Sequence, residues 1–267
     1  NEGVIVYRWA GWDPPWGIAY YVDHLNALVL TVVAVVSLIN LVATKKSIDE
    51  EFPDKLGPFY SLYVLMVTGC LGIVATGDAF NLYVLLEISA LTGYGLLAMG
   101  SKGRAPLSTL NYLYMGTIGA CFYLLGIGYL YIVTGSLNMV DIAGILPSLY
   151  QSKAVMAAFI ICMVGVWLKM ALFPLHAWLP NAYTYAPSAA SSLIAPLATK
   201  VMIYVMIRLI LTVFTPEFAF TALSVSNAVV WLAVIAIVVG AVLALQERSL
   251  KKMLTYVIVA EVGYMVG

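Results

Sequence analysis

The most informative part of this chain is the stretch GVWLKMALFPLHAWLPNAYTYAP, from Gly165 to Pro187. It belongs to an apolar run that opens at Ala154, and Lys169 occupies the part of that run where a membrane helix should be most apolar. Pro174 follows five residues later and lacks a backbone donor, so the helix must kink or break there. Pro180 is expected to repeat the interruption. A charge at membrane depth beside a broken helix is typical of an ion or substrate path.

A simpler explanation is a lysine that snorkels to the headgroups, followed by a proline that ends its helix. Lys169 lies too far from the next polar stretch for its ammonium to reach the headgroups easily. We therefore expect a central lysine, and regular helical hydrogen bonding that is lost between about Lys169 and His176.

The composition is that of an integral membrane protein. The chain has 267 residues, of which 63% are hydrophobic and 10% charged, and its mean hydropathy is +0.98. Soluble domains are about half apolar and about a quarter charged. The formal net charge of zero argues against nucleic-acid binding. The predicted fold class is all-α, a polytopic transmembrane helix bundle in a cell membrane.

Eight apolar runs have lengths near the ~20 residues that a spanning helix needs. They lie at about 23–44, 58–76, 79–99, 108–134, 153–180 (broken), 188–211, 228–246 and 252–267. Residues 1–22, rich in Trp, Tyr, Gly and Pro, are expected to form an extracytoplasmic loop with a short extended segment. Residues 138–150 are expected to lie flat at the membrane surface. Because the last apolar run stops at Gly267, we expect further helices in a longer protein.

The positive charges predict an orientation. Eight of the 13 lysines and arginines fall in the first, third and seventh connections, and only Arg8 and Lys153 fall on the opposite side. This asymmetry predicts that the connections near 45–55, 102–104 and 247–252 are cytoplasmic. The eight residues are Lys45, Lys46, Lys55, Lys102, Arg104, Arg248, Lys251 and Lys252.

Four ionisable residues are expected at the centre of the membrane: Glu87, Lys169, Lys200 and Glu261. At ~1.5 Å rise per residue, each lies in the middle third of a hydrocarbon core that is ~30 Å thick. Each alone costs about 2.5–3.5 kcal/mol on insertion scales. We interpret the four as a row of titratable sites across the membrane plane, with Glu87 and Lys169 close enough to interact directly or through one water.

Burial disfavours the charged form of each of these groups, whereas a neighbouring opposite charge favours it. A Glu–Lys pair that forms and breaks would therefore load and release a proton. The alternative is a set of static ion pairs that hold helices together.

The remaining polar candidates are weaker. His176, just after Pro174, is a proton-relay candidate, although a histidine at a helix break is also a common structural residue. His24 is expected at the interface, Asp78 is expected to cap a helix, and Arg208 is expected to snorkel outward.

No cofactor is expected. Cys70, Cys121 and Cys162 all lie in apolar runs and are expected to be small buried side chains, without a disulfide or a metal site. With two histidines and no Gly-rich phosphate loop, the sequence shows no haem, iron–sulfur or nucleotide site. We expect no redox catalysis in this chain.

Three segments resemble one family of membrane proteins. The segment GDAFNLYVLLEISALTGYGLLAMG resembles the fifth-helix signature of Mrp-type multisubunit cation/proton antiporters, closest to the D-type subunit. The segment LKMALFPLHAWLPNAYTYAPSAASSLIAPLATK is similar to a signature shared with antiporter-like subunits of complex I and of membrane-bound hydrogenases and sulfur reductases. The segment SLKKMLTYVIVAEVGYMVG resembles the tenth helix.

The resemblance implies a fold of about fourteen helices with two inverted five-helix repeats. Residues 58–211 would form the first repeat, and 228–267 would begin the second, within an antiporter-like domain over 23–267. Glu87 and Lys169 match the family's Glu–Lys pair, and Lys200 matches its bridging lysine. His176 matches the family's LFPLHAWLP histidine. Several relatives carry histidine where this chain has Glu261, which leaves the local pathway open.

The leading hypothesis is therefore a proton-translocating membrane subunit, with sodium as a second candidate ion, in a hetero-oligomeric Mrp-like or complex I-like assembly. Two alternatives remain. A solute transporter would bind an organic anion at the broken helix and would need a roomy central cavity. A structural subunit would keep its charges in locked pairs.

Overall fold

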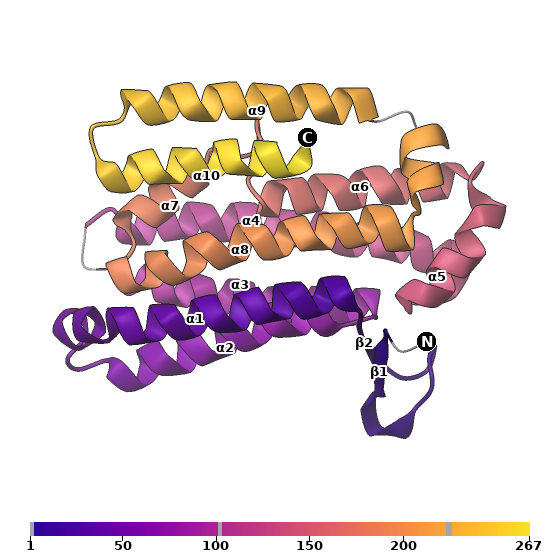
Figure 1. Ribbon diagram of the computed structural model, residues 1–267, viewed down its shortest axis with the longest axis horizontal. Helices are drawn as coiled ribbons and strands as arrows, with labels where there is room; N and C mark the ends of the chain where they lie inside the picture. The colour runs from indigo at the N-terminus through magenta and orange to yellow at the C-terminus, as the bar shows by residue number, and fades with distance from the viewer. Residues whose placement is uncertain (1–2, 101–102, 223–225) are drawn as a thin grey trace.

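The computed structural model describes residues 3–100, 103–222 and 226–267, and these residues form a bundle of long helices (Figure 1). The helices run roughly parallel to the long axis of the molecule, so that their connections gather at its two ends (Figure 1). They are α1 (His24–Glu51), α2 (Leu56–Ala75), α3 (Ala79–Ala98), α4 (Ala105–Thr134), α5 (Met139–Ile145), α6 (Lys153–Lys169), α7 (Leu179–Tyr185), α8 (Ser188–Arg208), α9 (Ser226–Gln246) and α10 (Leu250–Val266). The predicted all-α fold class is confirmed.

Six of the described helical segments are long and apolar enough to cross a membrane: α1, α2, α3, α4, α9, and α8 with its continuation η3 (Leu209–Val213). The other two expected spans correspond to α6 and α10, which have 17 residues each. That length is near the lower limit of about 17–25 residues for a spanning helix. For α6 the short length has a direct cause, because the chain leaves the helix at Lys169.

Helix α1 is longer than predicted. The apolar run ends near Thr44, but the helix continues through the polar segment KKSIDEE to Glu51. Lysine and glutamate are good helix formers, and Lys46 and Glu50 form an i,i+4 ion pair at 3.9 Å. The polar end of α1 can therefore be helical in water, beyond the apolar run.

The N-terminal segment forms the expected extended structure. Strands β1 (Ile5–Arg8) and β2 (Ala19–Val22) pair antiparallel, with Ile5 opposite Val22, and η1 (Trp9–Gly11) follows β1. The hairpin projects from the end of the bundle at which α1 begins (Figure 1). It is joined to the bundle through the Gly77 N–H, which donates to the Ala19 carbonyl at 2.9 Å.

Side-chain caps start α1 and α3, and the second of these, at Asp78, is predicted from the sequence. The Asp23 carboxylate accepts from the Asn26 N–H at 2.9 Å and begins α1. The Asp78 carboxylate accepts from the Asn81 N–H at 2.6 Å and begins α3. These bonds satisfy backbone donors that the first turn of a helix leaves unpaired.

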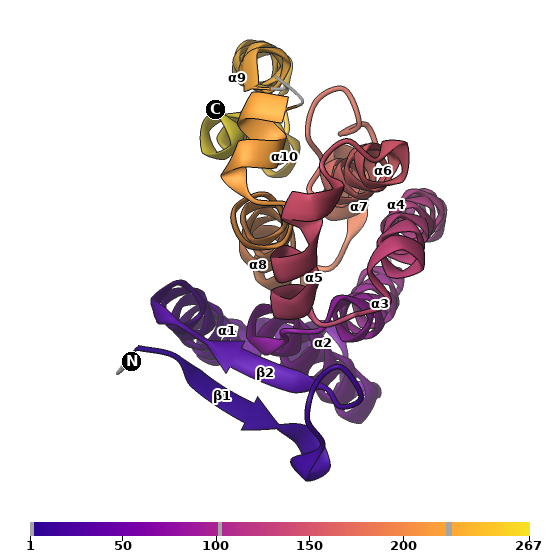
Figure 2. The same ribbon diagram turned by 90° about the vertical axis from the view of Figure 1, so that its right-hand side faces the viewer.

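Segment 138–150 also takes the expected position. Asn138 caps α5, which continues into η2 (Leu146–Leu149). Together they cross the ends of the long helices, as the end-on view in Figure 2 shows. The segment therefore covers one end of the bundle and does not span it.

Helix α8 occupies the centre of the bundle (Figure 2). It contacts α1, α2, α3, α6, α7 and α10. Thirteen of its 21 residues are buried. Lys200 therefore belongs to the helix around which the others pack.

Helices α4 and α6 approach each other unusually closely because both have glycine at the crossing. A Cβ on Gly165 of α6 would lie 2.6 Å from the Gly119 carbonyl oxygen and 2.8 Å from the Tyr123 nitrogen, both on α4. Contacts this short to backbone atoms require the helices to separate. The crossing thus depends on the absence of a side chain at Gly165.

Gly165→Ala should lower the stability of the protein, because overpacking of a tight contact costs about 1–3 kcal/mol. Thermal unfolding of the detergent-solubilised protein measures the change. Gly128→Ala on α4 is the matched control, since a Cβ there meets nothing within 4 Å and alanine is favoured over glycine in a helix by about 1 kcal/mol. A Gly165→Ala protein as stable as the Gly128→Ala protein would contradict the close crossing.

Candidate functional site

The helix that carries Lys169 is interrupted as predicted. Helix α6 ends at Lys169, and the next helix, α7, begins only at Leu179. Within the interruption the Leu172 N–H donates to the Trp167 carbonyl at 3.0 Å, five residues back instead of four. The Trp178 indole N–H donates to the Leu168 carbonyl at 3.0 Å. The same carbonyl also accepts from the Ala171 N–H at 3.3 Å, so the indole adds a second bond at the end of α6.

The two prolines have different positions in this region. Pro174 lies inside the interruption, as expected. Pro180, which was expected to interrupt the helix a second time, instead lies in the first turn of α7. A proline there loses no hydrogen bond, because first-turn N–H groups have no intrahelical partner in any case. Pro180 therefore helps to begin α7 and does not extend the break.

Lys169 and Glu87 form an ion pair, in agreement with the sequence prediction. Lys169 Nζ lies 3.7 Å from Glu87 Oε1, and the two side chains are 7% and 25% exposed. The separation exceeds a normal hydrogen bond, and this Oε1 has no hydrogen-bond partner among the described residues. The pair is thus close enough for charge stabilisation but is not locked by a direct hydrogen bond.

The stem of Lys169 depends on the glycine crossing of α4 and α6. A Cβ on Gly119 would lie 3.0 Å from Lys169 Cγ. The lysine therefore passes directly over the α4 backbone on its way to Glu87 of α3. The same glycines that bring the two helices together also provide the space for the buried cation.

Lys200 and Glu261 form a second pair. Lys200 Nζ donates to Glu261 Oε2 at 2.6 Å, between α8 and α10. The sequence predicts that both residues are central but does not predict that they are partners, because 61 positions separate them. The four expected ionisable residues are therefore arranged as two Glu–Lys pairs.

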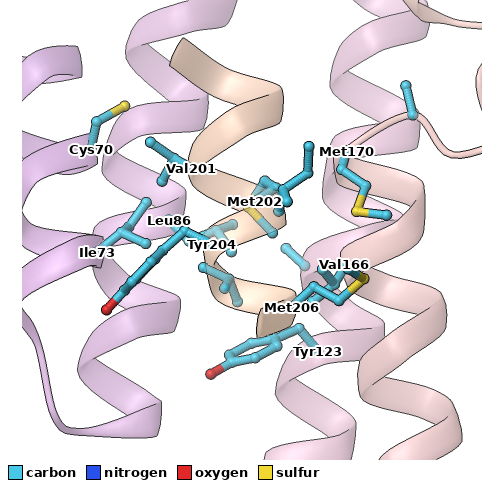
Figure 3. Close-up of a cluster of buried hydrophobic side chains, with 14 of the residues drawn as sticks. Cys70, Ile73, Leu86, Tyr123, Val166, Met170, Val201, Met202, Tyr204 and Met206 are labelled. Atoms are coloured by element: carbon cyan, nitrogen blue, oxygen red, sulfur yellow. The ribbon is translucent and has the colours of Figure 1, made fainter. Parts of the chain in front are cut away.

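A small cavity lies beside Lys169. Its volume is about 40 Å³, which is room for about two or three waters. Apolar side chains of α2, α3 and α8 form one wall, including Cys70, Ile73, Leu86, Val201 and Met202, which Figure 3 shows within the buried core. Tyr94, Tyr112 and Trp178 form another part of the lining.

His176 lies within the interruption, where its ring stacks on Phe173 with centroids 5.3 Å apart. Its Nδ1 is buried and has no hydrogen-bond partner among the residues that the structure describes. The aromatic contact accounts for the position of the ring. A relay role for His176 stays a prediction.

Two expectations about other side chains were wrong. Arg208 does not snorkel outward, because its guanidinium donates to Asp23 at 2.5 Å and to the Tyr204 hydroxyl at 2.9 Å, and it also contacts Asn26. The attraction of Asp23, 185 positions away in the sequence, outweighs escape to the headgroups.

Cys121 is exposed on α4, contrary to expectation, whereas Cys70 and Cys162 are buried as expected. His24 is exposed at the start of α1, consistent with an interfacial position.

The family of this chain follows from a comparison of its sequence with known families. The family described as NADH:quinone oxidoreductase/Mrp antiporter, transmembrane, matches residues 76–267. This chain belongs to that family. The match includes the interruption and all four central ionisable residues, and it confirms the resemblance that the sequence motifs indicate.

Curated relatives belong to two kinds of assembly. The N-type subunit of the NADH-quinone oxidoreductase of Desulforudis audaxviator is 44% identical over 260 residues, covering 97% of this chain and 51% of the relative. The D-type subunit of the Na(+)/H(+) antiporter of Bacillus subtilis is 28% identical over 263 residues, covering 98% of this chain and 52% of the relative. The chain thus spans about half the length of the curated relatives that it matches.

Solved structures of the family have the same fold. A chain of the Mrp complex from Dietzia sp. aligns with a TM-score of 0.86 at 25% identity, covering 98% of this chain and 48% of that one. A chain of the membrane-bound sulfane sulfur reductase, an archaeal respiratory membrane complex, aligns with a TM-score of 0.88 at 30% identity, covering 98% and 53%. The chain is a membrane protein with the antiporter-like fold.

The Asp23–Arg208 pair should stabilise the fold in a pH-dependent way. Burial opposes ionisation of Asp23, but hydrogen bonds from Arg208 and the Asn26 backbone outweigh it and hold the pKa of this carboxyl below its usual value. Asp23→Asn should cost about 2 kcal/mol at neutral pH, as expected for hydrogen bonds to charged groups. Because the pKa in the folded state is lowered, this contribution is complete above about pH 4 and is lost as the pH falls further.

Unfolding of the two proteins at pH 7 and at low pH measures this difference. Asp13→Asn is the control, since the Arg8–Asp13 pair is largely exposed and exposed pairs contribute about 0–1 kcal/mol. Equal losses for Asp23→Asn and Asp13→Asn at pH 7 would show that the network does not stabilise the bundle.

Proposed function

We propose that this chain is the proton-carrying part of a membrane subunit in a multisubunit cation/proton-translocating complex. Glu87, Lys169, Lys200 and Glu261 carry the protons as two coupled Glu–Lys pairs. The observation that supports the proposal most directly is the buried Lys169–Glu87 pair, whose 3.7 Å separation leaves it without a direct hydrogen bond. The pair lies at a helix interruption and beside a cavity of water size.

The chemistry follows from burial. A buried ammonium is stable while the Glu87 carboxylate is near, because the opposite charge replaces part of the lost hydration. When the carboxylate moves away or takes up a proton, the lysine loses this compensation and a proton leaves it. Re-formation of the pair draws a proton back. Lys200 and Glu261 extend the same cycle toward α10.

The main alternative, a transporter of organic anions at the broken helix, agrees less well with the structure. Ligand pockets usually have volumes of about 300–1,000 Å³. The cavity at Lys169 has about 40 Å³, and Glu87 already provides the counter-charge for this lysine. The space suits water and protons better than a carboxylate solute.

The names of the relatives guide the proposal on partners and ions. They include a D-type subunit of an Na(+)/H(+) antiporter and an N-type subunit of an NADH-quinone oxidoreductase. We propose that the whole protein assembles with other membrane subunits in a lipid bilayer and moves protons, with sodium as a candidate counter-ion. Chemistry other than ion movement is assigned to those other subunits.

The orientation and the repeat organisation are part of the same proposal. The end of the bundle that carries the α1–α2 and α9–α10 connections is assigned to the cytoplasm because positive charges gather there. Lys102, which contributes to this count, lies outside the described residues. The division into a first repeat over 58–211 and a second that begins at 228 stays a prediction.

Lys169→Ala should abolish proton transport by the assembled complex, because a methyl group carries no proton. Lys169→Arg should lower transport at least about tenfold, since a guanidinium with a pKa above ~12 does not release its proton readily. Purified complexes reconstituted in vesicles, with a pH-sensitive dye inside, measure the rate. Lys153→Ala and Lys153→Arg, at the exposed start of the same helix, are matched controls and should transport normally.

A static ion pair predicts the reverse order of effects. In that case Lys169→Ala would leave Glu87 without its partner and cost about 3–5 kcal/mol of stability, whereas arginine would largely replace lysine. Normal transport by a well-assembled Lys169→Arg complex would therefore refute proton release from Lys169.

A further inference from the structure

An aromatic cluster connects the cavity at Lys169 with α7. The Tyr94 and Tyr112 rings meet edge to face with centroids 4.7 Å apart, and Tyr112 stacks on Trp178 at 4.5 Å. Tyr183 of α7 meets Tyr112 at 6.5 Å and Trp178 at 6.2 Å, both edge to face. Tyr94, Tyr112 and Trp178 line the cavity. Tyr183 therefore lies directly behind that lining.

The Tyr183 hydroxyl is buried without a protein partner. The residue is 1% exposed, and its hydroxyl makes no hydrogen bond with any of the described residues. Buried polar groups are normally paired, and each exception needs an explanation such as a water molecule. The Tyr183 hydroxyl is such an exception, and it belongs to a residue packed against Tyr112 and Trp178 of the cavity lining.

Gly116 provides space for a second hydroxyl. A Cβ on Gly116 of α4 would lie 1.9 Å from the Tyr94 hydroxyl oxygen. The hydroxyl can thus occupy this position only because α4 has no side chain there. Gly116 lies one turn from Gly119, which in the same way leaves space for the stem of Lys169. One face of α4 therefore admits both the hydroxyl and the lysine.

A second cavity lies at the other end of α7. Its volume is about 340 Å³. It is lined by Glu50 and Glu51 at the end of α1 and by Tyr185, Ala186 and Ser188, where α7 ends and α8 begins. This is the end of the bundle where α1 and α3 finish and α8 begins, on the left in Figure 1. Trp178, just before α7, lines the cavity at Lys169. Tyr185, at the end of α7, lines the second cavity. Tyr183 lies between these two residues in the sequence.

We propose that the hydroxyls of Tyr183, Tyr112 and Tyr94, with water between them, form the proton route that links Lys169 to the cavity at the α7–α8 connection. This inference rests on the proposed function and assigns one entrance to it. A tyrosine hydroxyl is both donor and acceptor. Each hydroxyl passes on its own proton as it accepts the next one, so that one proton reaches Lys169 and no tyrosine changes its charge. Gly116 is a positioning residue for Tyr94.

Tyr183→Phe tests the route, because it removes one oxygen atom and retains the ring contacts. The whole complex is reconstituted in vesicles, and proton uptake and thermal stability are measured on the same preparation. We expect transport to fall at least about tenfold, as for loss of a positioned proton-transfer group. We expect stability to be unchanged or higher, because the buried hydroxyl that disappears has no protein partner.

Tyr123→Phe is the matched control. Tyr123 is also 1% exposed and lies in the buried core (Figure 3), but its hydroxyl donates to the Ala79 carbonyl at 3.1 Å. Its loss should lower stability and leave transport per assembled complex unchanged. A hydroxyl that matters only for structure would show this second pattern at Tyr183 as well.

The outcomes separate this inference from the proposed function. Wild-type transport by assembled Tyr183→Phe and Gly116→Ala complexes, while Lys169→Ala is inactive, would overturn the tyrosine route and leave the function of Lys169 intact. Loss of transport in both variants with retained assembly supports the route. A wild-type complex that moves no protons would overturn both proposals.

Discussion

The constraint on which the site depends is the burial of the Lys169 ammonium, whose side chain is only 7% exposed. An isolated ammonium at the centre of a bilayer is costly, and its cost falls only if opposite charge, carbonyl dipoles or water come within reach. Glu87 provides the charge, and the interruption after Lys169 exposes backbone groups that a continuous helix would use internally. The glycine crossing of α4 and α6 leaves the space that the lysine stem needs. The ion pair, the helix interruption and the glycine crossing therefore all help to accommodate the buried charge of Lys169.

Helix α8 links this site to the rest of the bundle. It carries Lys200, which pairs with Glu261 of α10. Two turns later it carries Arg208, which pairs with Asp23 at the start of α1. The second pair is near the end of the bundle, where it fixes α8 to the first helix. Both pairs therefore depend on the position of the same helix.

The sequence predicted most of what depends on local chemistry. The interruption near Pro174 and the cap at Asp78 follow from rules that involve a few neighbouring residues. The Lys200–Glu261 pair was not predicted, because the rotation of two helices 61 positions apart decides which side chains meet. Arg208 was predicted wrongly for the same reason, since its partner Asp23 is far away in the sequence. The sequence identifies which charges lie in apolar segments, but the partner of each charge requires the fold.

The shortness of α7 has a mechanical consequence. The first four N–H groups and the last four carbonyls of any helix lack intrahelical partners, so in a helix of seven residues end groups make up most of the backbone. Such a helix can gain or lose a turn by exchanging few internal hydrogen bonds, whereas the same change in α4, with 30 residues, would disturb its packing along the whole bundle. Because α7 begins ten residues after the buried lysine, such a change of length would take place next to the central ion pair.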